Sequence, residues 1–172
     1  MNRLGTATLT AAMALSLLGA VLPLGDAVAQ QKNWKEQLVG TWTYVSVDIV
    51  RADGSRIPLF GLNPSGIASF DANGRYVLVT TRTGLPKFAS NNRNQGTAEE
   101  NKAVVEGAIA HFGTYTVNEA DKTITFHIQT STFPNWNGID QKRPFTVTAT
   151  ELKWTTAASS GGTAEVILRR AD

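Results

Sequence analysis

Cysteine is missing from all 172 residues of the chain, and its absence excludes three kinds of chemistry. Without thiols there are no disulfide bonds, no cysteine nucleophile and no thiolate metal site. Histidine is nearly as scarce, because only His111 and His127 are present. A zinc site needs three or four ligands of set geometry, and no short spacing joins these two histidines to a carboxylate. We therefore predict no metal site and no cofactor.

An excess of one sign of charge is also lacking. The chain has 16 basic and 14 acidic residues, a formal net charge of +2, and its lysines and arginines are scattered. A nucleic-acid-binding surface would need a basic stripe. There is no G-x-S-x-G motif, and the segment Ser159–Gly162 (SSGG) lacks the lysine and the helix of a phosphate-binding loop. We predict no nucleic-acid partner.

A long apolar run occurs only near the N-terminus, from Leu9 to Leu24. The run is short for a membrane span and is interrupted by Pro23, which favours a cleaved secretory signal over a membrane anchor. A small-x-small pattern ending at Ala29 is typical of a signal peptidase site. We predict a signal peptide over residues 1–29 and one mature domain over residues 30–172. The domain is expected to be periplasmic or secreted, without stable membrane insertion; its oligomeric state stays open.

Short β-strand patterns dominate the mature chain. Eight segments rich in β-branched and aromatic residues alternate between apolar and polar positions and are separated by turn signals. They cover residues 38–51, 66–71, 75–82, 112–119, 122–131, 144–151, 152–156 and 164–170. Tight turns join the second segment to the third and the fourth to the fifth, which predicts two hairpins. The pattern indicates an all-β, antiparallel sandwich or barrel.

One helix is predicted at about residues 97–110. Thr97 and Glu100 have the spacing of a capping box, in which each side chain binds the other residue's backbone amide. The preceding segment 83–96 is polar and contains glycine, so it predicts a mobile loop long enough to lie over a barrel end. His111 follows the predicted helix, where a cation is favoured by the helix dipole.

The first and last predicted strands carry residues that could contact one another at one end of a barrel. The first strand begins with Gly40-Thr41-Trp42, and the last ends with Arg169 and Arg170. This arrangement is similar to lipocalin-class barrels, in which a G-x-W motif closes one end and a last-strand arginine packs across the indole. A guanidinium over an indole gains about 0.5–2 kcal/mol. The similarity implies that Arg169 or Arg170 packs on Trp42.

Further motifs extend the similarity over most of the chain. They are LVGTW, F-x-ANGRY, HFGTY, the terminal VILRR and, most specifically, TITFHI-x-x-S-x-FPNW-x-G-x-DQ-x-R. Together, from Leu38 to Arg170, they resemble the bacterial lipocalin-like domain family. The resemblance implies an eight-stranded, calycin-type antiparallel barrel with one helix. The family's biochemical role is largely unassigned, although some related barrels from biosynthetic clusters act as cyclases or isomerases.

One turn is unusual for its large aromatic residues. It lies within Thr130–Phe145, TSTFPNWNGIDQKRPF. Pro134 cannot donate to a sheet, so the preceding strand must end there or follow an edge. The asparagines and Gly138 suit a turn, yet Phe133 and Trp136 are bulky. We predict that Trp136 lies at the barrel mouth. The alternative is that it fills the end of the barrel as a core residue.

A ligand-binding set follows from these patterns, because aromatic rings beside a few hydrogen-bonding groups are typical of small-molecule pockets. His127 lies on the polar face of its strand, which faces either solvent or a lumen. It is the candidate general base, since imidazole titrates near neutral pH. The alternative is a surface or structural histidine. The predicted ligand-binding residues are Tyr76, His127, Phe133, Trp136 and Arg143.

Binding of a small, mainly apolar ligand in the barrel is the predicted function. One alternative is a cofactor-free isomerase or cyclase that uses His127, and another is a packed barrel whose surface binds an envelope protein. A pocket of about 300 Å³ or more, lined by aromatic residues, favours ligand binding. A filled core favours the interaction module. A buried His127 with a carboxylate or arginine partner favours the enzyme.

Overall fold

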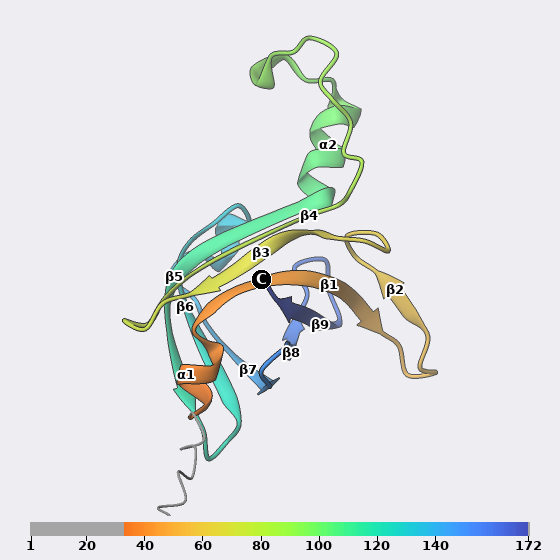
Figure 1. Cartoon of the computed structure of the whole chain (residues 1–172). Helices are drawn as coiled ribbons and strands as arrows, with labels where there is room; N and C mark the ends of the chain where they lie inside the picture. The colour runs from red at the N-terminus through yellow and green to blue at the C-terminus, as the bar shows by residue number, and fades with distance from the viewer. Residues whose placement is uncertain (1–32, 172) are drawn as a thin grey trace, which may run out of the picture. The chain divides into compact units, whose positions relative to one another are not determined.

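The computed structural model describes residues 33–171 and shows a closed antiparallel β-barrel (Figure 1). Eight strands form the wall in the order β1-β3-β4-β5-β6-β7-β8-β9, and pairing of β1 with β9 closes it. The strands are β1 (Gly40–Val50), β2 (Arg56–Pro58), β3 (Ser65–Phe70), β4 (Arg75–Thr81), β5 (Ala108–Asn118), β6 (Thr123–Ser131), β7 (Asp140–Val147), β8 (Glu151–Ala157) and β9 (Thr163–Arg170). The predicted fold class is confirmed.

The predicted signal peptide lies outside the described residues. Within the described range, none of the helices has the length and apolar character needed to cross a membrane.

Two strands begin about four residues earlier than predicted. β5 starts at Ala108, because residues 108–111 already pair with β4. β7 starts at Asp140, which pairs with His127 of β6. The charged residues at the start of β7 suggested a turn, but they alternate between the two faces of the strand. Arg143 therefore points into the barrel, while Lys142 points outward.

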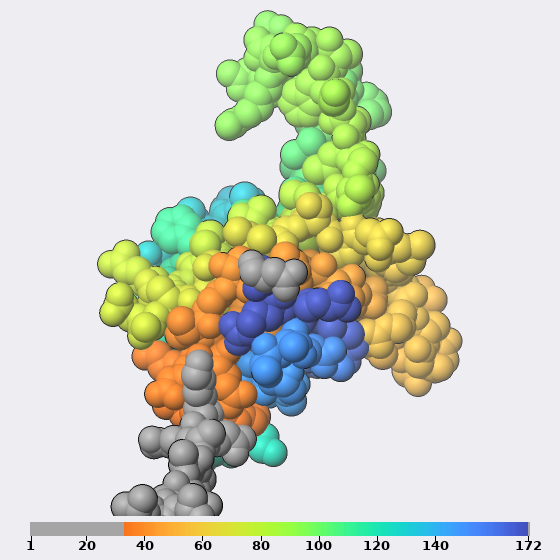
Figure 2. Space-filling model, viewed as in Figure 1, coloured from red at the N-terminus to blue at the C-terminus, as the bar shows by residue number. Residues whose placement is uncertain are grey.

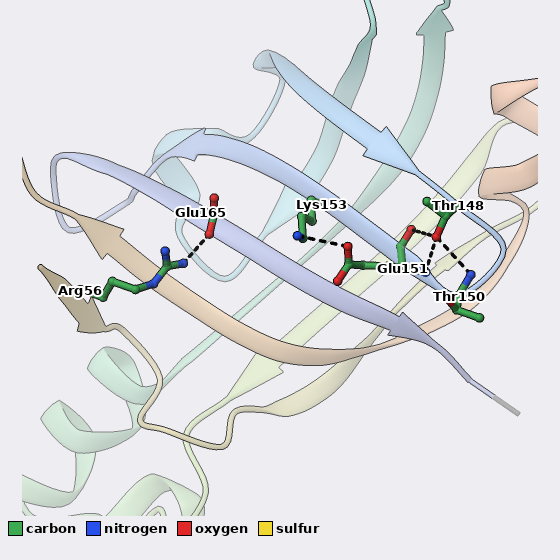
Figure 3. Close-up of polar contacts among 6 residues, drawn as sticks. All are labelled: Arg56, Thr148, Thr150, Glu151, Lys153 and Glu165. Atoms are coloured by element: carbon green, nitrogen blue, oxygen red, sulfur yellow. Dashed lines mark hydrogen bonds and ion pairs between the residues drawn. The ribbon is translucent and has the colours of Figure 1, made fainter. Parts of the chain in front are cut away.

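The ninth strand, β2, was not predicted and is held by polar contacts. β1 is long enough to pair with β3 along its first half and with β2 along its second half. Arg56 of β2 donates to Asp48 Oδ2 at 3.0 Å. Figure 3 shows its second contact, with Glu165 of β9. In the β7–β8 turn, the hydroxyl of Thr148 accepts hydrogen bonds from the backbone amides of Thr150 and Glu151 (Figure 3).

Trp42 fills one end of the barrel, which we call the closed end. Its side chain is fully buried, and its Nε1 donates to Leu38 O at 2.9 Å in the short helix α1 (Trp34–Leu38). The structure places Arg170, and not Arg169, over the indole, 4.1 Å from the ring centroid. Gly40 has a φ of +128°, and a Cβ there would lie 2.8 Å from Arg170 Nη1. Glycine is therefore required at this position.

The arginine also satisfies the backbone at the closed end. Its guanidinium donates to Val39 O at 3.0 Å and to Ala149 O at 2.8 Å, and it contacts Gln37 O. These carbonyls belong to the chain leading into β1 and to the β7–β8 turn. Arg170 thereby joins three segments at the base of the barrel.

The predicted helix is α2 (Ala98–Gly107), and Thr97 and Glu100 form its capping box. The described residues also form α1 and two short 3₁₀ helices, η1 (Arg93–Gln95) and η2 (Pro134–Trp136). Segment 83–96 is long enough to lie over a barrel end, but the structure places it elsewhere. Figures 1 and 2 show this segment, with α2, extending away from the barrel. It contributes no lining residue to the cavities described below.

Candidate ligand-binding site at the open end of the barrel

The barrel contains an inner cavity at the end opposite Trp42, which we call the open end. Its volume is about 60 Å³, enough for a few water molecules. Most of its wall is apolar, with a smaller number of polar side chains. The polar and aromatic lining residues are Tyr44, Phe60, Thr80, His111, Trp136, Arg143, Trp154, Thr156 and Ser159.

A wider hollow adjoins this cavity at the barrel mouth. The outer hollow has a volume of about 500 Å³ and includes side chains from the end of α2 and the start of β5. The two spaces are neighbours because Leu59, Phe60, Ile109 and Ser159 line both. The inner cavity is thus smaller than the 300 Å³ that would favour ligand binding, whereas the outer hollow exceeds that volume but faces solvent.

Arg143 of β7 places a positive charge in the wall of the inner cavity. Its side chain is only 3% exposed, and its guanidinium carbon lies 4.4 Å from the Phe126 ring centroid and 5.7 Å from that of Trp154. It donates to Gln141 Oε1 through Nη2. Among the described residues no carboxylate lies within ion-pair distance of it, and its Nε has no hydrogen-bond partner.

Desolvation dominates the electrostatics of this arginine. Burial lowers the pKa of Arg143 to about 10, although the Tyr44 and Tyr76 side chains act in the opposite direction. The guanidinium is therefore charged at neutral pH. Burial also disfavours the charged form of the two phenols, so it raises the pKa of Tyr44 and that of Tyr76, while the Arg143 charge acts to lower both. The two phenols stay protonated and neutral.

Trp154 of β8 supplies a second unpaired donor. Its indole is 2% exposed and lines the inner cavity beside Arg143. Its Nε1 is buried without a hydrogen-bond partner within the described structure. Buried donors without partners are uncommon and costly in native proteins. Both donors belong to residues that line the same inner cavity.

His111 was missed as a site residue. Because α2 ends at Gly107, His111 lies within β5 and faces inward, so its predicted role as a cation at the helix end is wrong. Its Nδ1 lies 2.8 Å from the Tyr76 hydroxyl. Burial, with a smaller effect of the Arg143 charge, lowers the pKa of His111 to about 3, so the ring is neutral. The inward alternation of His111 with Tyr115 is the signal that could have found it.

Because His111 is buried in its neutral form, the free energy of unfolding should fall at acidic pH. The unfolded imidazole takes up a proton near pH 6.5, whereas the folded one stays neutral down to about pH 3. Its contribution is therefore complete above pH 6.5 and is lost progressively as the pH falls toward 3. Between pH 7 and pH 5, we expect the wild type to lose about 2 kcal/mol more unfolding free energy than His111→Gln. Urea titrations at both pH values measure this; parallel losses in the two proteins would contradict it.

Trp136 lies in the wall of the inner cavity, next to Phe133 in the wall of the outer hollow. β6 ends at Ser131, before Pro134, and η2 then carries Trp136 back over the open end. The Asn137 side chain holds this turn by accepting from the Ser131 amide at 2.7 Å. Trp136 is half-buried, lines the inner cavity and contacts His111 edge-on at 5.7 Å. Phe133 contacts Trp136 at 5.6 Å and lines the outer hollow.

His127 is separated from the other predicted site residues. Phe126 and Ile128 face the core, so His127 lies on the outer face of β6. Its Nδ1 lies 2.8 Å from Asp140 Oδ1, and its Nε2 lies 3.4 Å from Thr116 Oγ1. This corrects the expectation that His127 lies in the same neighbourhood as Trp136, and of the two alternatives for the polar face of the strand it is the outward one that the structure shows. Of the other four, Trp136 and Arg143 line the inner cavity, Phe133 lines the outer hollow, and Tyr76 is buried behind His111.

Several solved structures are similar to the chain at low sequence identity. The chain is similar to the redesigned β-barrel b11L5F_LGL, with 18% identity and a TM-score of 0.42 over 80% of this chain and 95% of that one. It is also similar to an uncharacterized protein from Bacteroides eggerthii DSM 20697, with 10% identity and a TM-score of 0.41 over 78% and 99%. The redesigned barrel mFAP1, bound to DFHBI, is 18% identical with a TM-score of 0.39, and the similarity covers 79% of this chain and 97% of that one.

Sequence comparison identifies the family. No curated protein sequence matches the chain significantly. Among family profiles, that of the lipocalin-like domain matches residues 39–169, from the start of β1 almost to the end of β9. That match spans well over half of the chain and covers the whole barrel wall. The protein therefore belongs to the lipocalin-like domain family.

Proposed function

We propose that this protein binds a small, mainly apolar ligand at the open end of its barrel. The observation that carries the proposal is the pairing of a mostly apolar inner cavity with an adjoining hollow of about 500 Å³. Small-molecule sites are concave, mainly apolar and furnished with a few polar groups that orient the ligand. The open end has each of these properties, whereas the closed end is filled by Trp42.

The sizes of the two spaces define how such a ligand would lie. The inner cavity of about 60 Å³ admits one end of a molecule, and the rest must occupy the outer hollow. In the hollow, the apolar side chains of Leu59, Phe60, Val105, Ile109 and Phe133 are available for contact. Trp136, which lines the inner cavity, would lie beside the end of the ligand held there.

A second candidate, an interaction module, has one observation in its favour. Ile67 pairs with Val79, and Val77 pairs with Phe112, on neighbouring strands β3 to β5. All four side chains are 37–47% exposed, so they form an apolar stripe on the outer face. The small inner cavity is also compatible with a packed barrel. The isomerase alternative has no such support, because its proposed base, His127, lies outside the barrel.

A titration with a neutral, apolar fluorescent dye, N-phenyl-1-naphthylamine, tests ligand binding. We expect dye fluorescence to rise on binding and Trp136→Ala to weaken binding about five- to tenfold, because truncating a central aromatic contact typically costs more than 1 kcal/mol. The melting temperature should change little, since Trp136 is only half-buried.

The matched control is Trp34→Ala at the closed end, where the ring packs on Phe145 with centroids 5.0 Å apart. This variant should leave dye binding unchanged. If Trp136→Ala lost stability while dye binding stayed at the wild-type level, Trp136 would be a core residue. Absence of dye binding to the wild type would favour the interaction module.

A further inference from the structure

We infer that the ligand is an amphiphile with a carboxylate head, bound with the head inward against Arg143 and the apolar tail in the outer hollow. This inference rests on the proposed ligand-binding function and specifies the chemistry of its inner end. Three observations carry it: the buried charge, the unpaired donors and the size of the inner cavity.

The charge of Arg143 has no partner inside the protein. A buried guanidinium is normally paired with a carboxylate, because an isolated charge is expensive to remove from water. Here the neighbours of the guanidinium are the Phe126 and Trp154 rings and the neutral oxygen of Gln141. Nothing in the described part of the chain neutralises it, so an anionic ligand would supply the missing charge.

The other groups around the cavity also favour an anion. The free Nε of Arg143 and the free Nε1 of Trp154 are both buried donors. None of the residues lining the inner cavity is an aspartate or glutamate. His111 is neutral, with Nδ1 engaged by Tyr76, and so adds no competing charge. A carboxylate has two oxygens that accept hydrogen bonds, which matches an arginine beside a second donor.

The size of the inner cavity separates the head from the tail. A volume of about 60 Å³ accepts a carboxylate and the first carbons attached to it, but not a long chain. The outer hollow offers no comparable preference for charge, because Arg82 and Glu106 both line it. The polar end of the ligand is therefore expected to lie inside, with the apolar end facing the mouth.

Three probes with the same eight-carbon tail test this assignment: octanoate, 1-octanol and octylammonium. Each is titrated against the bound dye at pH 7.5, and octanoate is also titrated by calorimetry. We expect octanoate to bind at least about tenfold more tightly than octanol, and octylammonium to bind more weakly than octanol. In Arg143→Met the advantage of octanoate over octanol should disappear, whereas Arg143→Lys should retain part of it. Arg169→Met, which removes an exposed guanidinium that lines neither space, should change nothing.

A second readout does not depend on an Arg143 variant folding correctly. In wild-type protein, the indole N–H resonance of Trp154, assigned with Trp154→Phe, should move downfield with octanoate and stay in place with octanol. Equal affinity for octanoate and octanol, with an unmoved indole resonance, would overturn the carboxylate assignment while ligand binding itself stands. If none of the three probes displaced the dye, or the dye itself failed to bind, both proposals would be overturned.

Discussion

Replacing Trp42 with alanine is expected to lower the free energy of unfolding by about 3–5 kcal/mol, the usual range for emptying a buried aromatic site. The indole is fully buried, donates to Leu38 O at 2.9 Å and supports the Arg170 guanidinium at 4.1 Å. The substitution removes all three interactions together. It also leaves a cavity below α1 that the surrounding strands cannot fill without opening the closed end.

Denaturation with urea, followed by circular dichroism, measures the effect. Trp42→Phe is the matched control: it retains most of the ring volume but loses the hydrogen bond to Leu38, so its loss should be clearly smaller. Trp136→Ala removes the same side chain from a half-buried position and should also cost much less. An unfolding curve for Trp42→Ala that overlays the wild type would mean that the closed end does not depend on the indole.

The sequence predicted those parts of the fold that local patterns determine. Alternation of apolar and polar residues identified eight of the nine strands, since barrel strands bury every second side chain. The capping box identified the start of α2, because Thr97 and Glu100 satisfy backbone amides within one turn. The resemblance to lipocalin-class barrels, and not a local pattern, indicated the closed end, where Arg170 packs on Trp42 beside Gly40.

The remaining features depend on contacts that are distant in sequence. β2 has only three residues and is held by pairing with β1 and by the ion pairs of Arg56, so no local sequence pattern predicts it. Residues 108–111 resemble the end of a helix until pairing with β4 is known. For the same reason His111 was assigned to a helix terminus, although it is the buried neighbour of Tyr76.

The candidate site was found only in part. The aromatic turn correctly suggested that Trp136 lies near the barrel mouth, because proline ends a strand and Asn137 and Gly138 allow the chain to fold back. The same stretch gave no indication of which face of each strand points inward. One residue of register decides this, and it directs His127 outward and Arg143 inward. The volume of the inner cavity depends on side-chain packing and could not be predicted.

Replacing Arg143 with methionine is expected to raise the free energy of unfolding of the ligand-free protein by about 1–4 kcal/mol. The wild type buries this charge without an ionic partner, and burial lowers the pKa of Arg143 to about 10. Methionine is shorter than arginine, but it keeps an unbranched apolar stem and needs no hydration. The variant loses the stacking on Phe126 and the hydrogen bond to Gln141, and these losses limit the gain.

Arg170→Met is the matched control, because it makes the same chemical change at the other end of the barrel. Both guanidinium groups lie on an aromatic ring, at 4.4 Å for Arg143 on Phe126 and at 4.1 Å for Arg170 on Trp42. The two differ in their hydrogen bonds: Arg170 donates to three backbone carbonyls, whereas the Nε of Arg143 has no partner. Arg170→Met should therefore destabilise the protein while Arg143→Met stabilises it, as measured by urea denaturation at pH 7. A similar destabilisation in both variants would show that Arg143 is a structural residue like Arg170. The proposal that the inner cavity binds a ligand's anionic head would then be contradicted.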